Sequence, residues 1–335
     1  MQRPLSTLPL SSAVKAKLVT AGFHFISDLM NLKAPQLSRE AGVSQQEAMA
    51  VLAELEQGVP PPSMSALQLL QKEAELQSII TFCSSLDGAL GGGVPLGKTT
   101  EIYGVPGIGK TQLCLQLAVD VQVPQCFGGV GGEVIFMDTE GTFVLQRFAE
   151  LAAAAVTHCS LLAEDEEQRV AMETFTVDTI LSNTYVVRCH DYVELLAELR
   201  LLPSILAARP KVRLLVMDGM AAPFRPLLDD LSARTRHLGG VALQLAAVAT
   251  GHDVAVVVTN QMTTRLLGGG RSRLVPALGE LWGHALNIRL HLHWEGSQRL
   301  ATIAKSPAHA NVTVQYQISS DGFRDVDQSH AAGAK

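Results

Sequence analysis

The sequence lacks the features of an exported or membrane protein. No uninterrupted apolar run is long enough to span a bilayer. The N-terminus, MQRPLSTLPL, has neither the charged start nor the apolar stretch of a signal peptide. The five cysteines are scattered without C-x-x-C spacing, which excludes a disulfide framework and a zinc ribbon. We therefore predict an intracellular protein of the nucleus or cytoplasm with no membrane partner.

An excess of positive charge is also missing. The formal net charge is −6 at pH 7, because 32 acidic residues outnumber 26 Lys and Arg. This excludes a protein that coats duplex DNA with its whole surface, so any contact with nucleic acid must come from local basic loops. At 335 residues the chain is long enough for one large domain and one small one.

The strongest motif lies in residues 100–121, TEIYGVPGIGKTQLCLQLAVDV, which predict a strand, a phosphate loop and a helix. Residues 104–111 satisfy G-x-x-x-x-G-K-[ST], in which successive backbone N–H groups cradle a β-phosphate. We expect Lys110 to reach the β- and γ-phosphates and the Thr111 hydroxyl to bind Mg²⁺. The predicted nucleotide-binding residues here are Gly104, Val105, Pro106, Gly107, Ile108, Gly109, Lys110, Thr111 and Gln112.

The same pattern occurs once more upstream, over residues 92–99, where Lys98 takes the place of the lysine. That copy follows SSLDGALGGG, which offers no apolar strand, and it runs into a strand instead of a helix. We therefore assign the nucleotide to the downstream copy and interpret the upstream copy as a glycine-rich turn.

Polar side chains follow three predicted strands. Residues 134–137 end in Asp138-Thr139-Glu140, and residues 212–217 end in Asp218, in the form of a Walker B strand. Ligands bind at this edge of an open α/β sheet. We expect Glu140 to position or deprotonate the attacking water and Asp218 to hold Mg²⁺, while Asp138 or Thr139 could instead cap the next helix.

A third strand, residues 254–258, leads to Gln261, whose amide is placed to sense the γ-phosphate. Three arginines and three glycines then share one loop, which we expect to be flexible. Arginines without balancing acids beside a nucleotide site favour binding to a phosphate backbone, and we predict contact with single-stranded DNA. The arginines of this loop are Arg265, Arg271 and Arg273.

The order of these patterns predicts an α/β fold with a mostly parallel sheet flanked by helices and closed by antiparallel C-terminal strands. We divide the chain into an N-terminal helical domain at 1–57, a linker with a short helix at 58–78, an ATPase domain at 79–326 and a tail at 327–335. Short helices joined by glycine turns in the first domain favour a helix-hairpin-helix-like module, although a partner-docking bundle stays open.

Four stretches, GVPGIGKT, FMDTEGTF, LLVMDG and VVVTNQ, resemble the RecA-like recombinases of eukaryotes and archaea. LVPALGELWGHA and ATIAKSP are similar to the recombinase paralogs that support homologous recombination. The resemblance covers nearly the whole chain. It implies a RecA-like P-loop ATPase core, ATP and Mg²⁺ at a subunit interface, and Glu140, Lys110 and Gln261 as the residues that act on ATP.

The resemblance also implies DNA-facing loops at 219–232 and 262–282, with Arg225 and Arg234 as DNA contacts in or just beyond the first. Two positions depart from the recombinase pattern. The linker has Ser63-Met64-Ser65-Ala66 where the recombinase carries Phe-x-x-Ala, and Lys305 stands where it often carries Asp. We expect Lys305 to touch a neighbouring subunit's ATP, with an ordinary solvated lysine as the alternative.

The function that the resemblance implies is a weak, DNA-dependent ATPase of the nucleus. It would bind single-stranded DNA and assist homologous recombination and double-strand break repair within a complex of other recombinase paralogs and the main recombinase. Two alternatives remain open: a filament-forming strand-exchange recombinase, and a scaffold that holds ATP without useful turnover.

Overall fold

The computed structural model describes residues 5, 8, 10–25, 28–29, 32–58, 65–225, 231–267 and 271–326. Ser63, Met64, Gly268 to Gly270, part of the first predicted DNA loop (226–230) and the predicted tail (327–335) therefore lie outside the described residues. The chain divides into two compact units, Met1–Ala74 and Glu75–Lys335. Among the described residues, no helix combines the length and apolar character needed to cross a membrane.

The first unit is a small helical bundle. Its apolar core joins residues of three helices, including Leu18, Leu37 and Val51, which are almost fully buried. Gly22 and Gly42 follow helices and have positive φ angles of 92° and 62°, a backbone conformation that glycine adopts most easily. The helices of this unit are α1 (Ser12–Thr20), α2 (Ala34–Ala41), α3 (Gln45–Gly58) and α4 (Ala66–Ala74).

The second unit is built on one large twisted sheet with the strand order β12-β11-β10-β9-β3-β7-β6-β4-β5. Strands β9, β3, β7, β6, β4 and β5 are parallel to one another, and β10, β11 and β12 extend the sheet antiparallel. The main strands are β3 (Thr99–Gly104), β4 (Glu133–Asp138), β5 (Thr184–Arg188), β6 (Val212–Asp218), β7 (Ala255–Leu267), β8 (Arg271–Pro276), β9 (Ile288–Glu295), β10 (Gln298–Lys305), β11 (Thr313–Ser319) and β12 (Gly322–Arg324). A separate two-stranded sheet pairs β1 (Ser78–Ile79) with β2 (Val94–Pro95).

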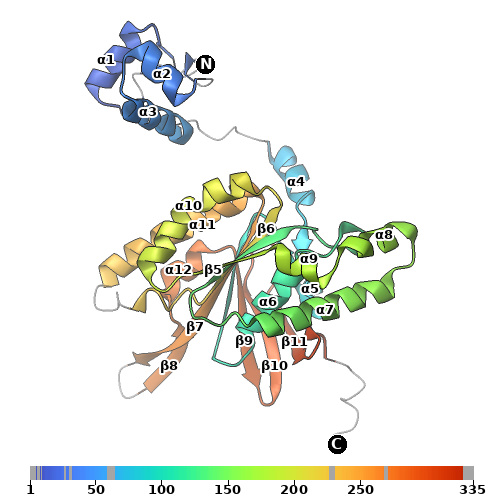
Figure 1. Ribbon diagram of the computed structural model, residues 1–335. Helices are drawn as coiled ribbons and strands as arrows, with labels where there is room; N and C mark the ends of the chain where they lie inside the picture. The colour runs from blue at the N-terminus through green and yellow to red at the C-terminus, as the bar shows by residue number, and fades with distance from the viewer. Residues whose placement is uncertain are drawn as a thin grey trace, which may run out of the picture. The chain divides into compact units, whose positions relative to one another are not determined.

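Helices cover both faces of the sheet, so the unit has three layers (Figure 1). On one face α6 and α7 pack on an apolar core that includes Leu117, Phe136 and Phe148. On the other face α10, α11 and α12 pack on a second core. The helices are α5 (Ser84–Leu90), α6 (Lys110–Asp120), α7 (Leu145–Leu162), α8 (Glu166–Thr174), α9 (Val177–Ser182), α10 (Tyr192–Ala208), α11 (Leu231–His252) and α12 (Gly279–Ala285). This architecture confirms the predicted α/β fold with antiparallel C-terminal strands.

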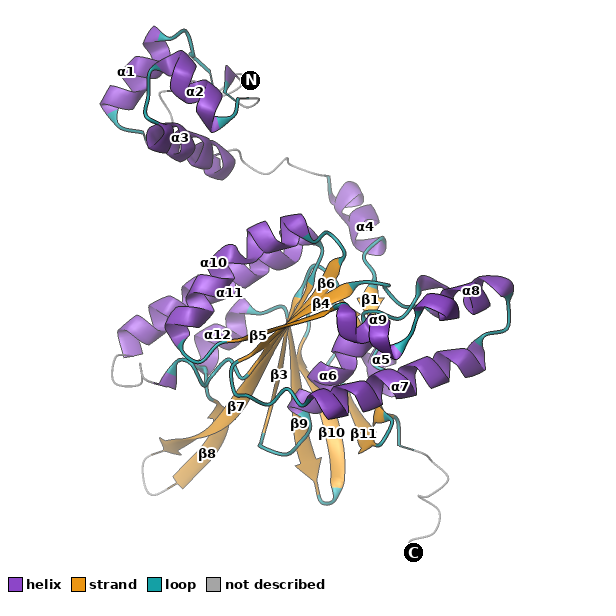
Figure 2. Ribbon diagram, in the orientation of Figure 1, coloured by secondary structure: helices purple, strands orange, loops and turns teal. Residues whose placement is uncertain are grey.

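Two details differ from the sequence prediction. The predicted flexible arginine loop is largely a β-hairpin: β7 continues past the sheet to Leu267 and pairs antiparallel with β8 (Figure 2). In addition, the first of the three C-terminal strands, β9, is parallel to β3, and the antiparallel pairing begins with β10. The long β7 therefore joins the centre of the sheet to the arginines.

Candidate functional site

The phosphate loop is held between β3 and the start of α6. Gly104 has no room for a side chain, because a Cβ atom there would lie 2.2 Å from the carbonyl oxygen of Leu292 on β9. Gly109 caps α6 with a φ angle of 117°, in the region that favours glycine. The Tyr316 hydroxyl of β11 donates to the Ile108 carbonyl at 2.8 Å. Strands β9 and β11 thus brace the loop, one at Gly104 and the other at Ile108.

Lys110 folds over this loop. Its Nζ donates to the carbonyls of Gly104 at 3.0 Å and Val105 at 3.2 Å. Burial lowers the pKa of Lys110, while Asp218 and Glu140 favour its charged form. A cavity of about 300 Å³ opens here and is lined by Gly107, Gly109, Lys110, Thr111, Gln112, Arg299 and Ile318.

The upstream copy of the motif has a different setting. Its glycines form a turn after α5, where Gly92 has a φ angle of 119° and Gly97 one of 71°. Val94 and Pro95 within it form β2, and the motif then runs directly into β3, so along the described chain it is followed by a strand and not by a helix. Lys98 therefore lies outside the nest geometry that a phosphate needs.

Asp218 ends β6 and is buried. Both of its carboxylate oxygens are already oriented: Thr259 Oγ1 donates to Oδ1 at 2.7 Å and Thr142 Oγ1 donates to Oδ2 at 3.0 Å. The Asp218 carboxylate and the Thr111 hydroxyl supply oxygen donors, which are the ligands that Mg²⁺ prefers. This donor set fits a magnesium ion held partly through water.

Glu140 lies in the loop after β4, and Asp138 shapes that loop. The Asp138 carboxylate accepts from the backbone N–H groups of Thr142 at 3.0 Å and Phe143 at 3.1 Å. Asp138 therefore folds its own loop and does not cap the next helix, whose N-cap is Val144. Burial, followed by the charge of Asp218, raises the pKa of Glu140 above its ordinary value.

A chain of side chains connects Glu140 to a predicted DNA contact. Gln261 Nε2 donates to Glu140 Oε1 at 2.6 Å, and Arg225 Nη2 donates to Gln261 Oε1 at 2.8 Å. The structure thus brings together side chains from the loop after β4, from the point on β7 where its pairing with β3 ends, and from the loop after β6. Gln261 donates to Glu140 and accepts from Arg225, so a change in what Glu140 binds can alter both hydrogen bonds.

The hairpin of β7 and β8 places like charges opposite each other. Arg265 pairs directly with Arg273, and Arg271 pairs through its backbone with Leu267. Arg265 makes a single exposed ion pair, with Glu280 at 3.4 Å. Like charges directly opposite on a two-stranded ribbon are destabilising, and the hairpin therefore concentrates positive charge.

Arg234 lies apart from these arginines. It is half-buried on α11, and its Nη2 donates to the Ala277 carbonyl at 2.9 Å, between β8 and α12. Burial lowers its pKa. Arg234 thus hydrogen-bonds to the backbone that follows the hairpin. Its predicted contact with DNA stays a prediction.

Lys305 is neither a freely solvated lysine nor bound to a carboxylate among the described residues. Its Nζ donates to the carbonyls of Gly283 at 3.3 Å, His284 at 2.8 Å and Leu286 at 2.5 Å, at the C-terminal end of α12. A cation there satisfies carbonyls that the helix leaves free and opposes the negative end of the helix dipole. The predicted contact with a neighbouring ATP stays a prediction.

This placement gives Lys305 a measurable effect on stability. We expect Lys305→Met to lower the free energy of unfolding by about 1–3 kcal/mol, because it removes the donor to three carbonyls. That corresponds to a fall in Tm of roughly 2–4 °C per kcal/mol, measured by thermal unfolding. Lys211→Met, at an exposed position, is the control. Equal melting temperatures would show that the carbonyls are satisfied without Lys305.

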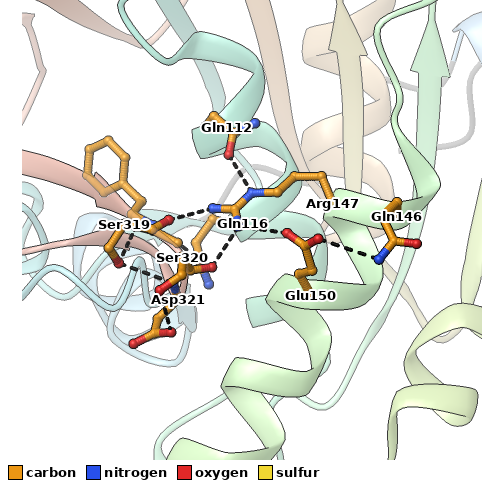
Figure 3. A network of polar contacts seen from close by, with 10 residues as sticks. Gln112, Gln116, Gln146, Arg147, Glu150, Ser319, Ser320 and Asp321 are labelled. Carbon is orange, nitrogen blue, oxygen red and sulfur yellow. Dashed lines mark hydrogen bonds and ion pairs between the residues drawn. The ribbon is translucent and has the colours of Figure 1, made fainter.

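One residue near the cavity carried no signal in the sequence. Arg147 of α7 binds Gln112 Oε1 through Nε at 3.0 Å and the carbonyls of Ser320 and Ser319 at 2.6 and 2.7 Å (Figure 3). It also pairs with Glu150 at 3.2 Å. Arg147 therefore ties the first turn of α6 to the turn between β11 and β12. Gln112, Ser319 and Ser320 are too far from Arg147 in sequence for any local motif to indicate these contacts.

Comparisons with known proteins identify the family to which the chain is similar. The family model described as Rad51 matches residues 72–326. DNA repair protein RAD51 homolog 3 of Cricetulus griseus is 51% identical over 340 residues, which covers 97% of this chain and 93% of that protein. RAD51 homolog 3 of Dictyostelium discoideum is 41% identical, covering 80% and 71%. DNA repair and recombination protein RadA of Metallosphaera sedula is 29% identical, covering 95% and 94%.

Proposed function

This chain belongs to the Rad51 family, and on that basis we propose that it is an ATP-binding recombinase paralog that hydrolyses ATP weakly, binds single-stranded DNA and assists homologous recombination in the nucleus. The observation that carries the proposal is the hydrogen-bonded chain from Glu140 through Gln261 to Arg225. It joins the residue that would act on water to a side chain of the predicted DNA surface.

The residues of the site divide the chemistry among them. Lys110 binds the β- and γ-phosphates, and Glu140 orients the attacking water and takes its proton. Thr111 and Asp218 would hold Mg²⁺, which when bound neutralises charge on the phosphate oxygens. Thr142 and Thr259 keep the Asp218 carboxylate in one orientation by donating to it.

DNA binding is coupled to this site through β7. Gln261 lies where β7 leaves its pairing with β3, and the same strand continues to Arg265. A change in the Gln261 hydrogen bonds therefore acts on the base of the hairpin. The Arg225 guanidinium, which is exposed, lies on the same path.

Neutralising the three hairpin arginines together, as Arg265→Gln, Arg271→Gln and Arg273→Gln, should weaken binding to single-stranded DNA. Each phosphate contact contributes about 0.7 to the slope of log K against log salt, so the slope should fall by roughly 2. Fluorescence anisotropy at several salt concentrations measures it, and ATP affinity should stay unchanged.

The matched control neutralises three exposed arginines of the α8 and β5–α10 region, Arg169, Arg188 and Arg200. An unchanged slope in the hairpin variant, or an equal loss in the control, would assign DNA to another surface, such as the N-terminal bundle.

Assembly with other recombinase subunits is supported by the β5 edge of the sheet. Among the described residues, β5 pairs on one side only, with β4. Beside it lies an apolar cavity of about 440 Å³ between β4, β5 and α10, which includes Met137, Val187 and Ile205. An unpaired strand edge with an apolar pocket suits an extended segment of a partner. We propose that a paralog or the main recombinase supplies that segment.

The filament-forming alternative predicts a different particle size from the proposed paralog subunit. A filament-forming recombinase would grow on single-stranded DNA with ATP, whereas a paralog subunit would stay small without its partners. Light scattering of the pure protein, with and without ATP and DNA, tests this. Binding of ATP without any release of phosphate in the same samples would favour the scaffold.

A further inference from the structure

One cation of the nucleotide cavity belongs to no motif. Arg299 of β10 lines the cavity together with Gly107 and Gly109 of the phosphate loop. It is half-buried, and its Nε atom is shielded from solvent with no hydrogen-bond partner among the described residues. No ion pair links Arg299 to a carboxylate within the described part of the chain. A buried donor of this kind usually has a partner, and the Arg299 Nε atom has none among the described residues although the side chain lines the cavity.

Neighbouring strands fix the position of Arg299. Its partner on β9 is Trp294. The Arg299 Cζ atom lies 4.4 Å from the centroid of the Trp294 ring, which is a cation–π contact. Its partner on β11 is Tyr316, whose hydroxyl donates a hydrogen bond to the Ile108 carbonyl of the phosphate loop. One strand pair thus braces the loop and presents a guanidinium beside it.

We propose that Arg299 binds the diphosphate portion of the nucleotide from within the same subunit. The loop amides cradle the β-phosphate, and Arg299 lines the same cavity as Gly107 and Gly109 of that loop. An arginine can donate to phosphate oxygens through Nε and Nη together. Lys110 would approach the triphosphate from the helix side and Arg299 from the β10 side. Arg299 is a binding residue here and takes no part in proton transfer. The inference deepens the proposed function and depends on nucleotide binding at this loop.

The test compares Arg299→Ala and Arg299→Lys with the wild-type chain in titrations with ATP, ADP and AMP. Loss of a charge-assisted contact should weaken ATP and ADP binding by about 10- to 100-fold in the alanine variant. The loss should be equal for ATP and ADP, because the contact is with the diphosphate, and AMP affinity should change little. Lysine keeps the positive charge but lacks the planar guanidinium that can donate through two nitrogens. The loss of ATP and ADP affinity in Arg299→Lys should therefore be intermediate.

Arg200→Ala, at an exposed position on α10, is the control for loss of a surface arginine. Unchanged ADP affinity in Arg299→Ala, or a loss confined to ATP, would overturn the assignment. Thermal unfolding without nucleotide should match wild type, and a fall in Tm together with equal losses for all nucleotides including AMP would show a structural role instead. If the wild-type chain binds none of the nucleotides, the proposed function itself fails, which is a distinct result.

Discussion

Lys110→Ala should abolish nucleotide binding. The ammonium is half-buried over the loop, where it contacts the Gly104 and Val105 carbonyls, and little water is available to replace it beside a polyphosphate. Removing one partner of a buried charge pair costs about 2–5 kcal/mol, which raises Kd roughly 30- to 5,000-fold. Titration with a fluorescent ATP analogue measures the change.

Lys98→Ala is the matched control, because the chain offers the same motif twice. Lys98 precedes a strand and is not among the residues that line the cavity at the downstream loop, so its variant should bind ATP within about twofold of wild type. Equal losses in the two variants would mean that the downstream loop alone does not hold the nucleotide.

Glu140→Gln should remove turnover and keep ATP bound. The substitution preserves shape, but an amide cannot take the proton of the attacking water, and general bases typically contribute 10²- to about 10⁴-fold to rate. Phosphate release in the presence of single-stranded DNA should fall by that factor, while the affinity for ATP should change little. Glu167→Gln, at an exposed position on α8, is the control. Retained hydrolysis in Glu140→Gln would assign the base elsewhere.

The direction in which ATP hydrolysis changes with pH follows from the protonation of Glu140. Only the carboxylate form of Glu140 accepts a proton, so turnover is lost as pH falls through its pKa. Burial and Asp218 raise that pKa above the ordinary value of 4.5, and Arg225 and Lys110 lower it. The acid limb of kcat/KM should therefore lie above pH 4.5. Arg225→Gln should move the limb to still higher pH, and a limb that moves to lower pH would contradict the role of Arg225 beside Glu140.

The parallel sheet and its strand ends could be predicted because local sequence specifies them. Asp138 and Asp218 follow apolar runs that are buried on both faces, as parallel strands require. Parallel strands bring their ends to one edge, and Glu140 and Gln261 indeed meet there through a hydrogen bond. The predicted roles of these residues stay predictions.

The hairpin could not be predicted, because the distal part of β7 pairs with β8 beyond the main sheet. Residues 262–267 have no apolar run, and the following glycines are more typical of loops than of strands. The pairing of Arg265 with Arg273 depends on a register that composition does not reveal. Arg147 and Arg299 were missed for the same reason: each acts on elements distant in sequence.

The central position of β3 has a consequence for synthesis of the chain on the ribosome. All six residues of β3 are buried, yet its neighbours β7 and β9 are translated only after β4, β5 and β6. During that interval both edges of the nascent β3 are unpaired, and unpaired strand edges aggregate readily or recruit chaperones. Phosphate-loop geometry is reached later still, because the residue that closes on Gly104, Leu292, lies in β9. The nucleotide site is thus encoded early in the message and completed near its end.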